Sequence, residues 1–498
     1  MSGRLAEVLA VSAVAAAITI LMAWAVIRAP SERMFGMDIV GRHHDPFTVM
    51  QQFERPISIG MYSQPVTDIT GALFSRVAGP IAAYNWLILL SFPLAAAITY
   101  LLARHLALSP FAATVAALAY AFSPFHLAHA AYHPHIAQVQ WLPLYLLALW
   151  RCLDAATPVA IGFLGVATLA VTLSNFYGGV IAAVITPIAV GAYWLVMRPV
   201  TRRPTHAVSV TVLTLAFIAV CGLAYVTYLA QSMLAHRDAF AFQRSDVLLF
   251  SAKWWSYLVP PVAHPLLGAT AHRIWIEAGV RDGLLEQQVS LGWGIVALAL
   301  IAVGRYIWII RNRESACGVR VPILVAVAIA AFACSLSSLP SALLYGVVPM
   351  FRAYARFGVL VQLMGALLAG VGVDFLLRAG TTRARIACAA LIALVAFEYA
   401  AAPQALSRDV LPTTAHRWVV QQPGRARTFD CAPRDDASAS IQWLTADRVM
   451  VPASSTDCTE PNLSRKLAAS GYTQLLVRRD TADGQWFVNH TAPSGLRV

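Results

Sequence analysis

Two carboxylates and two imidazoles lie within eight residues of one another near the start of this 498-residue chain. They belong to Asp38, His43, His44 and Asp45, which directly follow the first long apolar run. An ionised carboxylate can take a proton from a hydroxyl group, so Asp45 and Asp38 are candidates for a catalytic base. His43, His44 and Asp45 could instead hold a divalent metal ion, although adjacent side chains rarely converge on one ion. The cluster therefore predicts proton-transfer chemistry with no cofactor required, and a metal-bound cluster is the alternative.

Further polar side chains recur at the ends of later apolar runs. The segment SPFHLAHAAYHPHIAQVQ carries four histidines, and His126 and His129 are spaced to share one helix face. Pro134 then ends the helix, because proline cannot continue it. Any one of these side chains could simply anchor the chain at the lipid headgroups. With His43 and His44, they predict a substrate-binding rim made of His126, His129, His133, His135, Gln138, Asn175, Tyr177, Glu286, Arg352 and Arg356.

Arg352 and Arg356 indicate what this rim would bind. They are four residues apart in FRAYARF, at the start of an expected helix. Two guanidinium groups at this spacing can hold one phosphate through forked hydrogen bonds. A phospholipid headgroup would satisfy them as well. Asp374 and Arg378 have the same spacing at another helix end, where a local ion pair is the simpler expectation.

The composition predicts the class of protein. Hydrophobic residues make up 59% of the chain and charged residues 12%, which is typical of a polytopic α-helical membrane protein. The net charge of +12 could indicate nucleic-acid binding, but the basic residues form short clusters between apolar runs and no nucleic-acid motif accompanies them. Ionisable side chains are costly within lipid, so we expect them to collect at the ends of the spans.

About eleven apolar runs are long enough for membrane spans of roughly 20 residues. They lie near residues 5–27, 81–103, 111–130, 137–153, 158–174, 178–197, 207–229, 290–310, 321–346, 357–378 and 384–401. Alternate short loops are rich in arginine, which places the N-terminus in the cytoplasm and the C-terminus outside. We therefore expect a multi-pass protein of a cytoplasmic membrane. Its first run exceeds the apolar core of a signal peptide and is interpreted as an uncleaved anchor.

Three segments too polar to cross a membrane fall on the same predicted side. Residues 28–80 and 230–289 would be outer loops of a transmembrane domain over residues 1–401. Residues 402–498 would form an extracytoplasmic C-terminal domain. This tail alternates strand-like stretches (VMVPAS, TQLLVRR, QWFVNH) with a helix-like SRKLAAS, a pattern that predicts a small α/β fold.

The cysteines agree with an exported tail. Only Cys431 and Cys458, of the seven in the chain, fall in the tail. A disulfide persists in an oxidising compartment, and closing a loop of this length would contribute about 3–4 kcal/mol. We therefore expect a Cys431–Cys458 bridge, and two unpaired thiols are the alternative.

Six segments stand in order between roughly residues 36 and 378. They are HDPF; GPIAAYNWLILLSFPLAAAITYLLAR; YAFSPFHLAHAAYHPHIAQVQWLPLYLLAL; SDVLLFSAKWWSYLVPPVAHPLLG; EQQVSLGWG; and VPMFRAYARFGVLVQLMGALLAGVG. In order and spacing the chain resembles the GT-C superfamily of membrane glycosyltransferases, and within it the bacterial YfhO-like group. The tail segment HRWVVQQPG fits the same resemblance.

The resemblance implies a catalytic or metal-binding carboxylate in the first outer loop and a polyprenyl-phosphate-linked sugar donor. The related oligosaccharyltransferases carry an acid, one further residue and then Asp-Pro-aromatic. Here Asp45-Pro46-Phe47 matches the second half, but His43 replaces the acid, which weakens a metal-binding role. Asp45 or Asp38 would take the proton of the acceptor hydroxyl, and the two arginines would stabilise the departing phosphate. Direct displacement would invert the anomeric carbon, and the later histidines would line the cleft.

The expected function is therefore transfer of a sugar to a glycan, lipid or protein acceptor of the cell envelope, with membrane lipids and no nucleic acid as partners. A transporter or flippase of lipid-linked sugars is the main alternative, although such proteins place polar groups near mid-membrane on broken helices. A non-catalytic partner in envelope polysaccharide assembly would keep the same fold without needing the acids.

Overall fold

The computed structural model describes residues 2–36, 49–50, 52–53, 64–197, 241–281, 283–312, 321–410, 418–419, 421, 427–431, 449–450, 462–477 and 485–486. The chain divides into two compact units. The larger comprises Met1–Pro30, Met34–Val40 and Val49–Arg408. The smaller comprises Ser31–Arg33, Gly41–Thr48 and Asp409–Val498.

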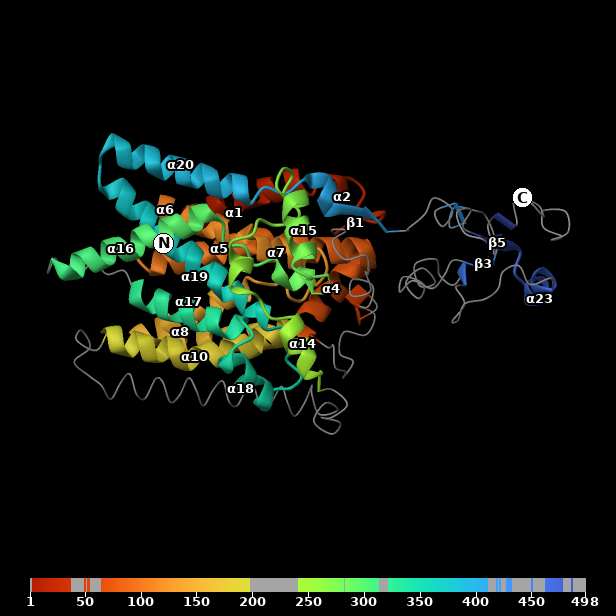
Figure 1. Ribbon diagram of the computed structural model, residues 1–498, viewed down its shortest axis with the longest axis horizontal. Helices are drawn as coiled ribbons and strands as arrows, with labels where there is room; N and C mark the ends of the chain where they lie inside the picture. The colour runs from red at the N-terminus through yellow and green to blue at the C-terminus, as the bar shows by residue number, and fades with distance from the viewer. Residues whose placement is uncertain are drawn as a thin grey trace. The chain divides into compact units, whose positions relative to one another are not determined.

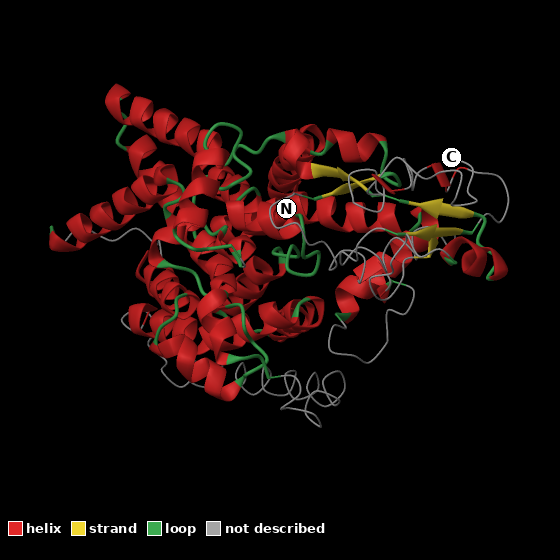
Figure 2. Ribbon diagram, turned by 45° about the vertical axis from the view of Figure 1, so that its right-hand side comes forward, coloured by secondary structure: helices red, strands yellow, loops and turns green. Residues whose placement is uncertain are grey.

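The larger unit is built of helices (Figures 1 and 2). They are α1 (Ser2–Met22), α2 (Trp24–Arg28), α4 (Pro65–Ala78), α5 (Pro80–His105), α6 (Pro110–Ala121), α7 (Pro124–Ala130), α8 (Trp141–Asp154), α9 (Pro158–Ser174), α10 (Phe176–Met197), α14 (Arg244–Leu249), α15 (Gly268–Glu277), α16 (Trp293–Arg311), α17 (Val321–Ser335), α18 (Leu339–Val347), α19 (Gly358–Arg378) and α20 (Thr382–Glu398). Short 3-10 turns are η1 (Trp254–Tyr257), η2 (Leu284–Gln287), η3 (Tyr354–Phe357) and η4 (Pro403–Leu406). Strand β1 (Arg33–Phe35) pairs with β2 (Ser407–Asp409).

The described helices make this chain a membrane protein. Six segments are long and apolar enough to cross a bilayer, namely Gly3–Met22, Pro80–His105, Pro110–Ala130, Phe176–Val196, Trp293–Arg311 and Tyr354–Arg378. Two shorter apolar helices, α9 and α17, accompany them. The expected span at 207–229 lies outside the described residues, so the total of eleven stays a prediction.

Two of the expected spans are interrupted in the structure. The run at 111–130 divides into α6 and α7, where Ser123 caps the second helix by accepting the N–H of His126 at 3.4 Å. The run at 321–346 divides into α17 and α18, and Ser338 begins the second helix. A serine followed by proline within two residues starts a new helix at each break, because proline suits the first turn. The Ser123 hydroxyl satisfies an exposed backbone N–H, whereas at the second break the Ser338 N–H donates to the Ser341 hydroxyl at 2.9 Å. Hydropathy alone does not predict these breaks.

Helix α19 lies at the centre of the larger unit and is buried from Gly358 to Asp374. It packs against α6, α16, α17 and α20. A Cβ added to Gly372 would lie 2.2 Å from the carbonyl oxygen of Leu298 in α16, and one added to Gly370 would lie 2.6 Å from the side chain of Leu108. Glycine is required at Gly372, where α19 meets the backbone of α16, because small residues let membrane helices approach closely.

The smaller unit contains a three-stranded parallel sheet in the order β4-β3-β5. Its elements are β3 (Thr428–Asp430), β4 (Val449–Met450), α23 (Leu463–Ala469) and β5 (Gln474–Leu476). Thr428 is in register with Val449 on one side and with Gln474 on the other. Helix α23 comes between β4 and β5 in the chain, and a crossover connection of this kind joins parallel strands of one sheet.

The sequence pattern of the tail matches most of these elements. Strands β4 and β5 fall within VMVPAS and TQLLVRR, and α23 covers SRKLAA of SRKLAAS and begins one residue earlier, at Leu463. The strand expected in QWFVNH is wrong over its described part, because Gln485 and Trp486 are helical. Strand β3 was not expected. It is a buried strand of three residues, too short to show alternation.

Candidate functional site

A buried ion pair joins the turn before α16 to the turn before α19. The Arg356 Nε–H donates to both carboxylate oxygens of Glu286, at 3.0 and 3.1 Å, and Nη2 donates to Oε1 at 2.5 Å. Glu286 is 4% exposed and Arg356 is 6% exposed. Buried charges are costly unless they are paired with good geometry. The forked contact therefore fixes both side chains.

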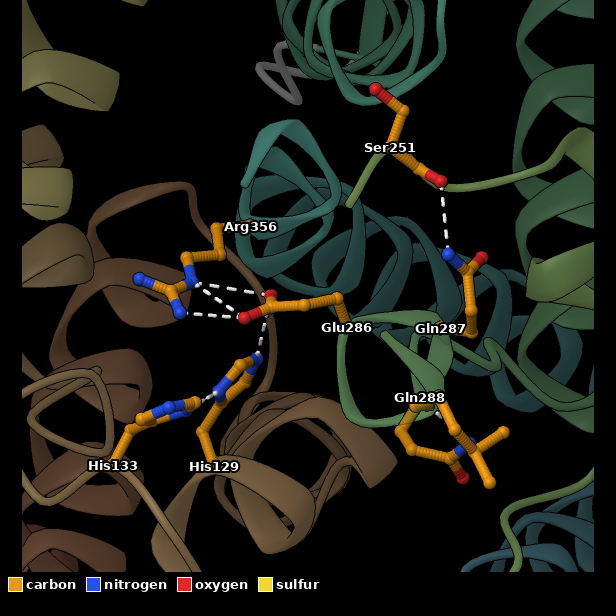
Figure 3. A network of polar contacts seen from close by, with 8 residues as sticks. His129, His133, Ser251, Glu286, Gln287, Gln288 and Arg356 are labelled. Carbon is orange, nitrogen blue, oxygen red and sulfur yellow. Dashed lines mark hydrogen bonds and ion pairs between the residues drawn. The ribbon is translucent and has the colours of Figure 1, made fainter. Parts of the chain in front are cut away.

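Two histidines extend this pair into a cluster. His129, at the end of α7, is 1% exposed, and its Nε2 lies 3.8 Å from Glu286 Oε2. Its Nδ1 lies 3.2 Å from Nδ1 of His133. Figure 3 shows the two rings below the carboxylate and Arg356 on its far side. We refer to His129, His133, Glu286 and Arg356 as the buried cluster.

Amide side chains hold the turn that carries Glu286. The Gln287 amide donates to the Ser251 carbonyl at 2.9 Å and accepts from the Ser256 hydroxyl at 2.8 Å. Gln288 points elsewhere and accepts the N–H of Val262 at 3.0 Å (Figure 3). Both amides are buried. The sequence analysis missed these roles, although the run EQQ placed three polar residues where the apolar run of α16 was about to begin.

A buried tyrosine fastens the same loop to α17. The Tyr257 hydroxyl donates to Ser335 Oγ at 2.7 Å, and its carbonyl accepts the N–H of Leu291 at 2.9 Å. Burial raises the pKa of the Tyr257 phenol, because the charged form is disfavoured away from water. Tyr257 therefore remains a neutral hydrogen-bond donor.

Four predicted rim residues line one small cavity. Gln138, Asn175, Tyr177 and Arg356 border it together with Phe125, and its volume of about 20 Å³ has room for about one water molecule. The Arg356 guanidinium lies 4.0 Å from the centre of the Tyr177 ring. The tyrosine is positioned at the start of α10, where its N–H donates to Asn175 Oδ1 at 2.9 Å. These four residues, from three separate segments, therefore border one cavity.

His126 does not join the buried cluster. Its Nδ1–H donates to the Ala121 carbonyl at 2.6 Å, and its Nε2 lies 2.8 Å from Ser91 Oγ. Its ring stacks on Phe92, with centroids 4.1 Å apart. Both ring nitrogens are engaged within the protein, so this histidine secures α7 against α5. Sharing a helix with His129 was not enough to bring the two side chains to one site.

His135 also lies in a separate contact. Its Nε2–H donates to Asp68 Oδ1 at 2.9 Å, and Asp68 is 1% exposed in α4. The second oxygen of Asp68 accepts the N–H of Gln64 at 2.7 Å. The sequence analysis missed Asp68. Its signal was a single acid in PVTDITG, within a segment treated only as an outer loop.

Arg352 differs from Arg356 in its surroundings. Its guanidinium lies 4.3 Å from the ring centre of Phe242 and 4.9 Å from that of Phe250. The Asp246 carboxylate is 4.0 Å away, and the Arg352 side chain is 40% exposed. The two arginines therefore do not grip one ligand as a matched pair. Arg352 is the accessible one, and Arg356 is held by Glu286.

Asp38, His43, His44 and Asp45 lie outside the described residues, so their roles stay predictions. The chain leading to them is anchored at Asn85 in α5. The Asn85 amide accepts the N–H of Phe35 at 2.9 Å and donates to the Pro30 carbonyl at 2.8 Å. Phe35 also contacts Phe92, with ring centroids 6.1 Å apart, so the described chain before this segment lies beside the ring that stacks on His126 of α7.

Cys431 is disulfide-bonded. Its expected partner, Cys458, lies outside the described residues, and the pairing stays a prediction. Cys152, Cys334 and Cys388 are free and buried, in agreement with their places in apolar runs.

An apolar cavity of about 460 Å³ lies between α1, α6, α7 and α20. Its lining includes Leu21, Phe122, Leu127 and Val395. Leu127 and His129 are two residues apart on α7. The helix therefore borders the apolar cavity at one residue and contributes to the buried cluster at the other.

Comparison with known proteins gives structural likenesses only. No protein-family model matches the chain, and no curated protein matches it. The chain is similar to the arabinofuranosyltransferase AftD from Mycobacteria, with 14% identity and a TM-score of 0.48 over 94% of this chain and 35% of that one. It is also similar to ArnT from Cupriavidus metallidurans bound to undecaprenyl phosphate, with 13% identity and a TM-score of 0.34 over 95% of this chain and 90% of that one. The chain thus spans about a third of the length of AftD.

Proposed function

We propose that this chain is a membrane glycosyltransferase of the GT-C superfamily, which moves a sugar from a polyprenyl-phosphate-linked donor to a cell-envelope acceptor at the outer face of the membrane. The buried cluster carries the proposal. His129, Glu286 and Arg356 are each supplied by one of the sequence segments that resemble the superfamily, and they meet at the ends of apolar spans. Buried ionisable groups at such a place are expensive and usually functional.

The two arginines would have different roles in donor binding. Arg352 is accessible, and two aromatic rings restrict its guanidinium, so it can meet a lipid phosphate at the membrane surface. Arg356 is hydrogen-bonded to Glu286. It would therefore act indirectly, by keeping Tyr177 and the small cavity beside Tyr177 in position. This assignment revises the expectation that both arginines bind the phosphate directly.

The apolar cavity beside α7 would receive the start of the polyprenyl chain. Its aliphatic and aromatic lining suits an isoprenoid, because such a chain gains free energy by leaving water for an apolar surface. Leu127 lies within two residues of His129 on the same helix. A chain in this cavity would bring the attached phosphate to the end of α7, near the polar rim.

The reaction itself would be a single displacement. Asp45, or alternatively Asp38, takes the proton from the acceptor hydroxyl as the oxygen bonds to the anomeric carbon. The bond between that carbon and the phosphate oxygen breaks, and the phosphate departs with the electron pair. Arg352 stabilises the charge that develops on the phosphate. The anomeric carbon is inverted because attack and departure occur on opposite sides.

One observation favours a transporter or flippase as a second candidate. The segment Pro110–Ala130 is broken between α6 and α7, and broken helices form the substrate sites of many transporters. The polar residues of α7 gather at its end, at the rim rather than in mid-membrane. A flippase would move the lipid-linked sugar across a vesicle without forming a glycoside.

The proposal is tested with purified protein in liposomes and radiolabelled polyprenyl-phosphate-linked sugars extracted from source membranes. We expect Asp45→Asn to lower transfer about 10²–10⁴-fold, as loss of a general base typically does, while binding of undecaprenyl phosphate is unchanged. Arg352→Ala should weaken that binding about 10- to 100-fold, because a charged hydrogen bond contributes about 1.5–3 kcal/mol. Arg378→Ala is the matched control and should change neither quantity.

Asp38→Asn separates the two acids. If it abolishes transfer while Asp45→Asn does not, the base is Asp38 and the first outer loop keeps its role. Full activity in both variants would contradict the proposed chemistry of this loop. Movement of the labelled lipid across the bilayer without any glycoside product would favour the flippase.

A further inference from the structure

We propose that His129, His133 and Glu286 bind a divalent transition-metal ion, best matched by zinc, while Arg356 holds the carboxylate from its other side. One ring nitrogen of each histidine and one carboxylate oxygen of Glu286 lie within 4.8 Å of one another. This site is distinct from the acids and histidines of the first outer loop. It does not depend on the chain being a transferase.

The spacing of the two imidazoles fits a tetrahedral ion. Zinc–nitrogen bonds of about 2.0–2.1 Å in a tetrahedron separate two ligand nitrogens by about 3.3 Å. The Nδ1 atoms of His129 and His133 are 3.2 Å apart. The longest separation within the group, up to 4.8 Å, would have to shorten by about 1.5 Å, which rotation of the Glu286 side chain can supply because its carboxylate sits at the end of three rotatable bonds.

The local helical structure places the His129 and His133 side chains on the same side of the chain. They are four residues apart, and the His133 N–H donates to the His129 carbonyl at 2.7 Å, which continues the helical turn beyond α7. Residues four apart lie on one side of a helical turn. Phe125, one turn earlier, packs against the His129 ring with centroids 4.2 Å apart, which fixes the ring plane.

The two oxygens of Glu286 are already differentiated. Oε1 accepts two hydrogen bonds from Arg356, at 2.5 and 3.0 Å, whereas Oε2 accepts one at 3.1 Å. Oε2 is also the oxygen beside the other ring nitrogen of His129, Nε2, at 3.8 Å, so an ion held by the two Nδ1 atoms requires the carboxylate to move from Nε2 toward Nδ1. An ion can therefore bind Oε2 while Arg356 keeps Oε1, and carboxylates that bind metals are commonly hydrogen-bonded in this way.

The donor set selects the kind of ion. Two imidazoles and one carboxylate suit zinc and its first-row neighbours, whereas magnesium and calcium prefer ligand sets made of oxygen. Three protein ligands leave the fourth position of a tetrahedral zinc open. Glu286 and Arg356 cancel in charge, so a bound ion adds two uncompensated positive charges in a buried place. A water in the open position would offset part of this charge by losing a proton, which zinc promotes.

Metal content tests the inference without any substrate. The full chain is purified through an affinity tag that contains no histidine, stripped with a chelator, incubated with excess zinc and gel-filtered. Elemental analysis should then find one zinc per wild-type chain and almost none in His133→Ala. His133 is only partly buried, so this variant should fold. X-ray absorption at the zinc edge should show nitrogen and oxygen ligands at about 2.0–2.2 Å.

His135→Ala is the matched control, because it removes a nearby histidine that is engaged with Asp68, and it should keep one zinc per chain. The double variant His43→Ala/His44→Ala should keep it too. Zinc should also raise the melting temperature of the wild type and leave that of His133→Ala unchanged, because only a protein that binds the ion is stabilised by it.

Two results would overturn the inference. One is a wild-type chain that retains no zinc after this treatment. The other is a His133→Ala variant that retains as much zinc as the wild type. Loss of zinc from the His43→Ala/His44→Ala variant alone would assign the ion to the first outer loop instead.

Discussion

The two ends of helix α19 carry polar networks of different kinds. Beside its N-terminal end, Arg356 pairs with Glu286 and both are buried. At its C-terminal end, Asp374 accepts the N–H of Ser109 at 3.0 Å and pairs with Arg378 at 3.6 Å, as the sequence predicted, but the Arg378 side chain is 51% exposed. A helix of 21 residues is about 30 Å long, which matches the hydrocarbon thickness of a bilayer.

The second network continues along neighbouring helix ends. Arg104, in the last turn of α5, lies 3.3 Å from Glu7 and donates to the Leu108 carbonyl at 2.6 Å. Cations at these positions offset the partial negative charge of helix C-termini and satisfy unpaired carbonyls. Such contacts are explained by helix capping and by the membrane surface.

The comparison shows which feature distinguishes a candidate site from an anchor. Both networks use arginines and acids, so residue type does not separate them. The buried cluster combines three distant segments and buries its arginine, whereas the network at the other end joins groups beside helix termini and keeps its arginines partly in solvent. Convergence and burial, rather than charge, identify the site.

The largest expected effect concerns which side of the membrane each network occupies. Alkaline phosphatase fused after residue 405 should be active, because the chain there is predicted to be exported. The same enzyme fused after Arg378 should be inactive, and a cytoplasmic fluorescent reporter at that point should be bright. Equal phosphatase activity at both points would contradict the assignment of the two networks to opposite faces.

Removing one partner of the buried pair should strongly destabilise the protein. Arg356→Leu leaves the Glu286 carboxylate buried without its partner, which typically costs about 3–5 kcal/mol. The double variant Arg356→Leu/Glu286→Leu should recover most of that loss, because no uncompensated charge remains. Denaturation in detergent, followed by circular dichroism, measures both free energies of unfolding. A single variant as stable as the double one would show that the pair does not act as a unit.

A smaller loss is expected at the opposite end of α19. Asp374→Ala removes the acceptor for both the N–H and the hydroxyl of Ser109, which begins α6. Loss of hydrogen bonds to a charged group should lower the free energy of unfolding by about 1.5–3 kcal/mol. Transfer activity should be kept, because this network is distant from the proposed site. Abolished transfer in a variant that remains folded would contradict the distinction between the two networks.

The smallest effect is expected for Arg378→Ala. The Arg378 side chain is half in solvent, although Asp374 is buried, and ion pairs with an exposed partner at this helical spacing contribute about 0.5 kcal/mol or less. The same denaturation experiment at low and high salt should show a difference that shrinks as salt rises. A loss of several kcal/mol would mean that Arg378 belongs to a buried network after all.

The sequence by itself determined where the helices lie and which residues could form a polar rim. Long apolar runs predicted α5, α10, α16 and α19 to within a few residues, because a bilayer requires about 20 apolar residues per span. It also supplied the candidates for the rim, since ionisable residues in such a chain gather at the ends of spans. It did not reveal the break before Pro124, where local capping overrides hydropathy.

Only the tertiary structure decided which rim residues act together. His126 and His129 are equivalent by spacing, yet one stacks on Phe92 and the other reaches Glu286. Arg352 and Arg356 are equivalent by spacing too, yet Arg356 alone is buried against a carboxylate that lies 70 residues earlier in the chain. Which side chains meet across such separations depends on how the helices pack. Hydropathy and helical period describe only local structure, so they do not predict that packing.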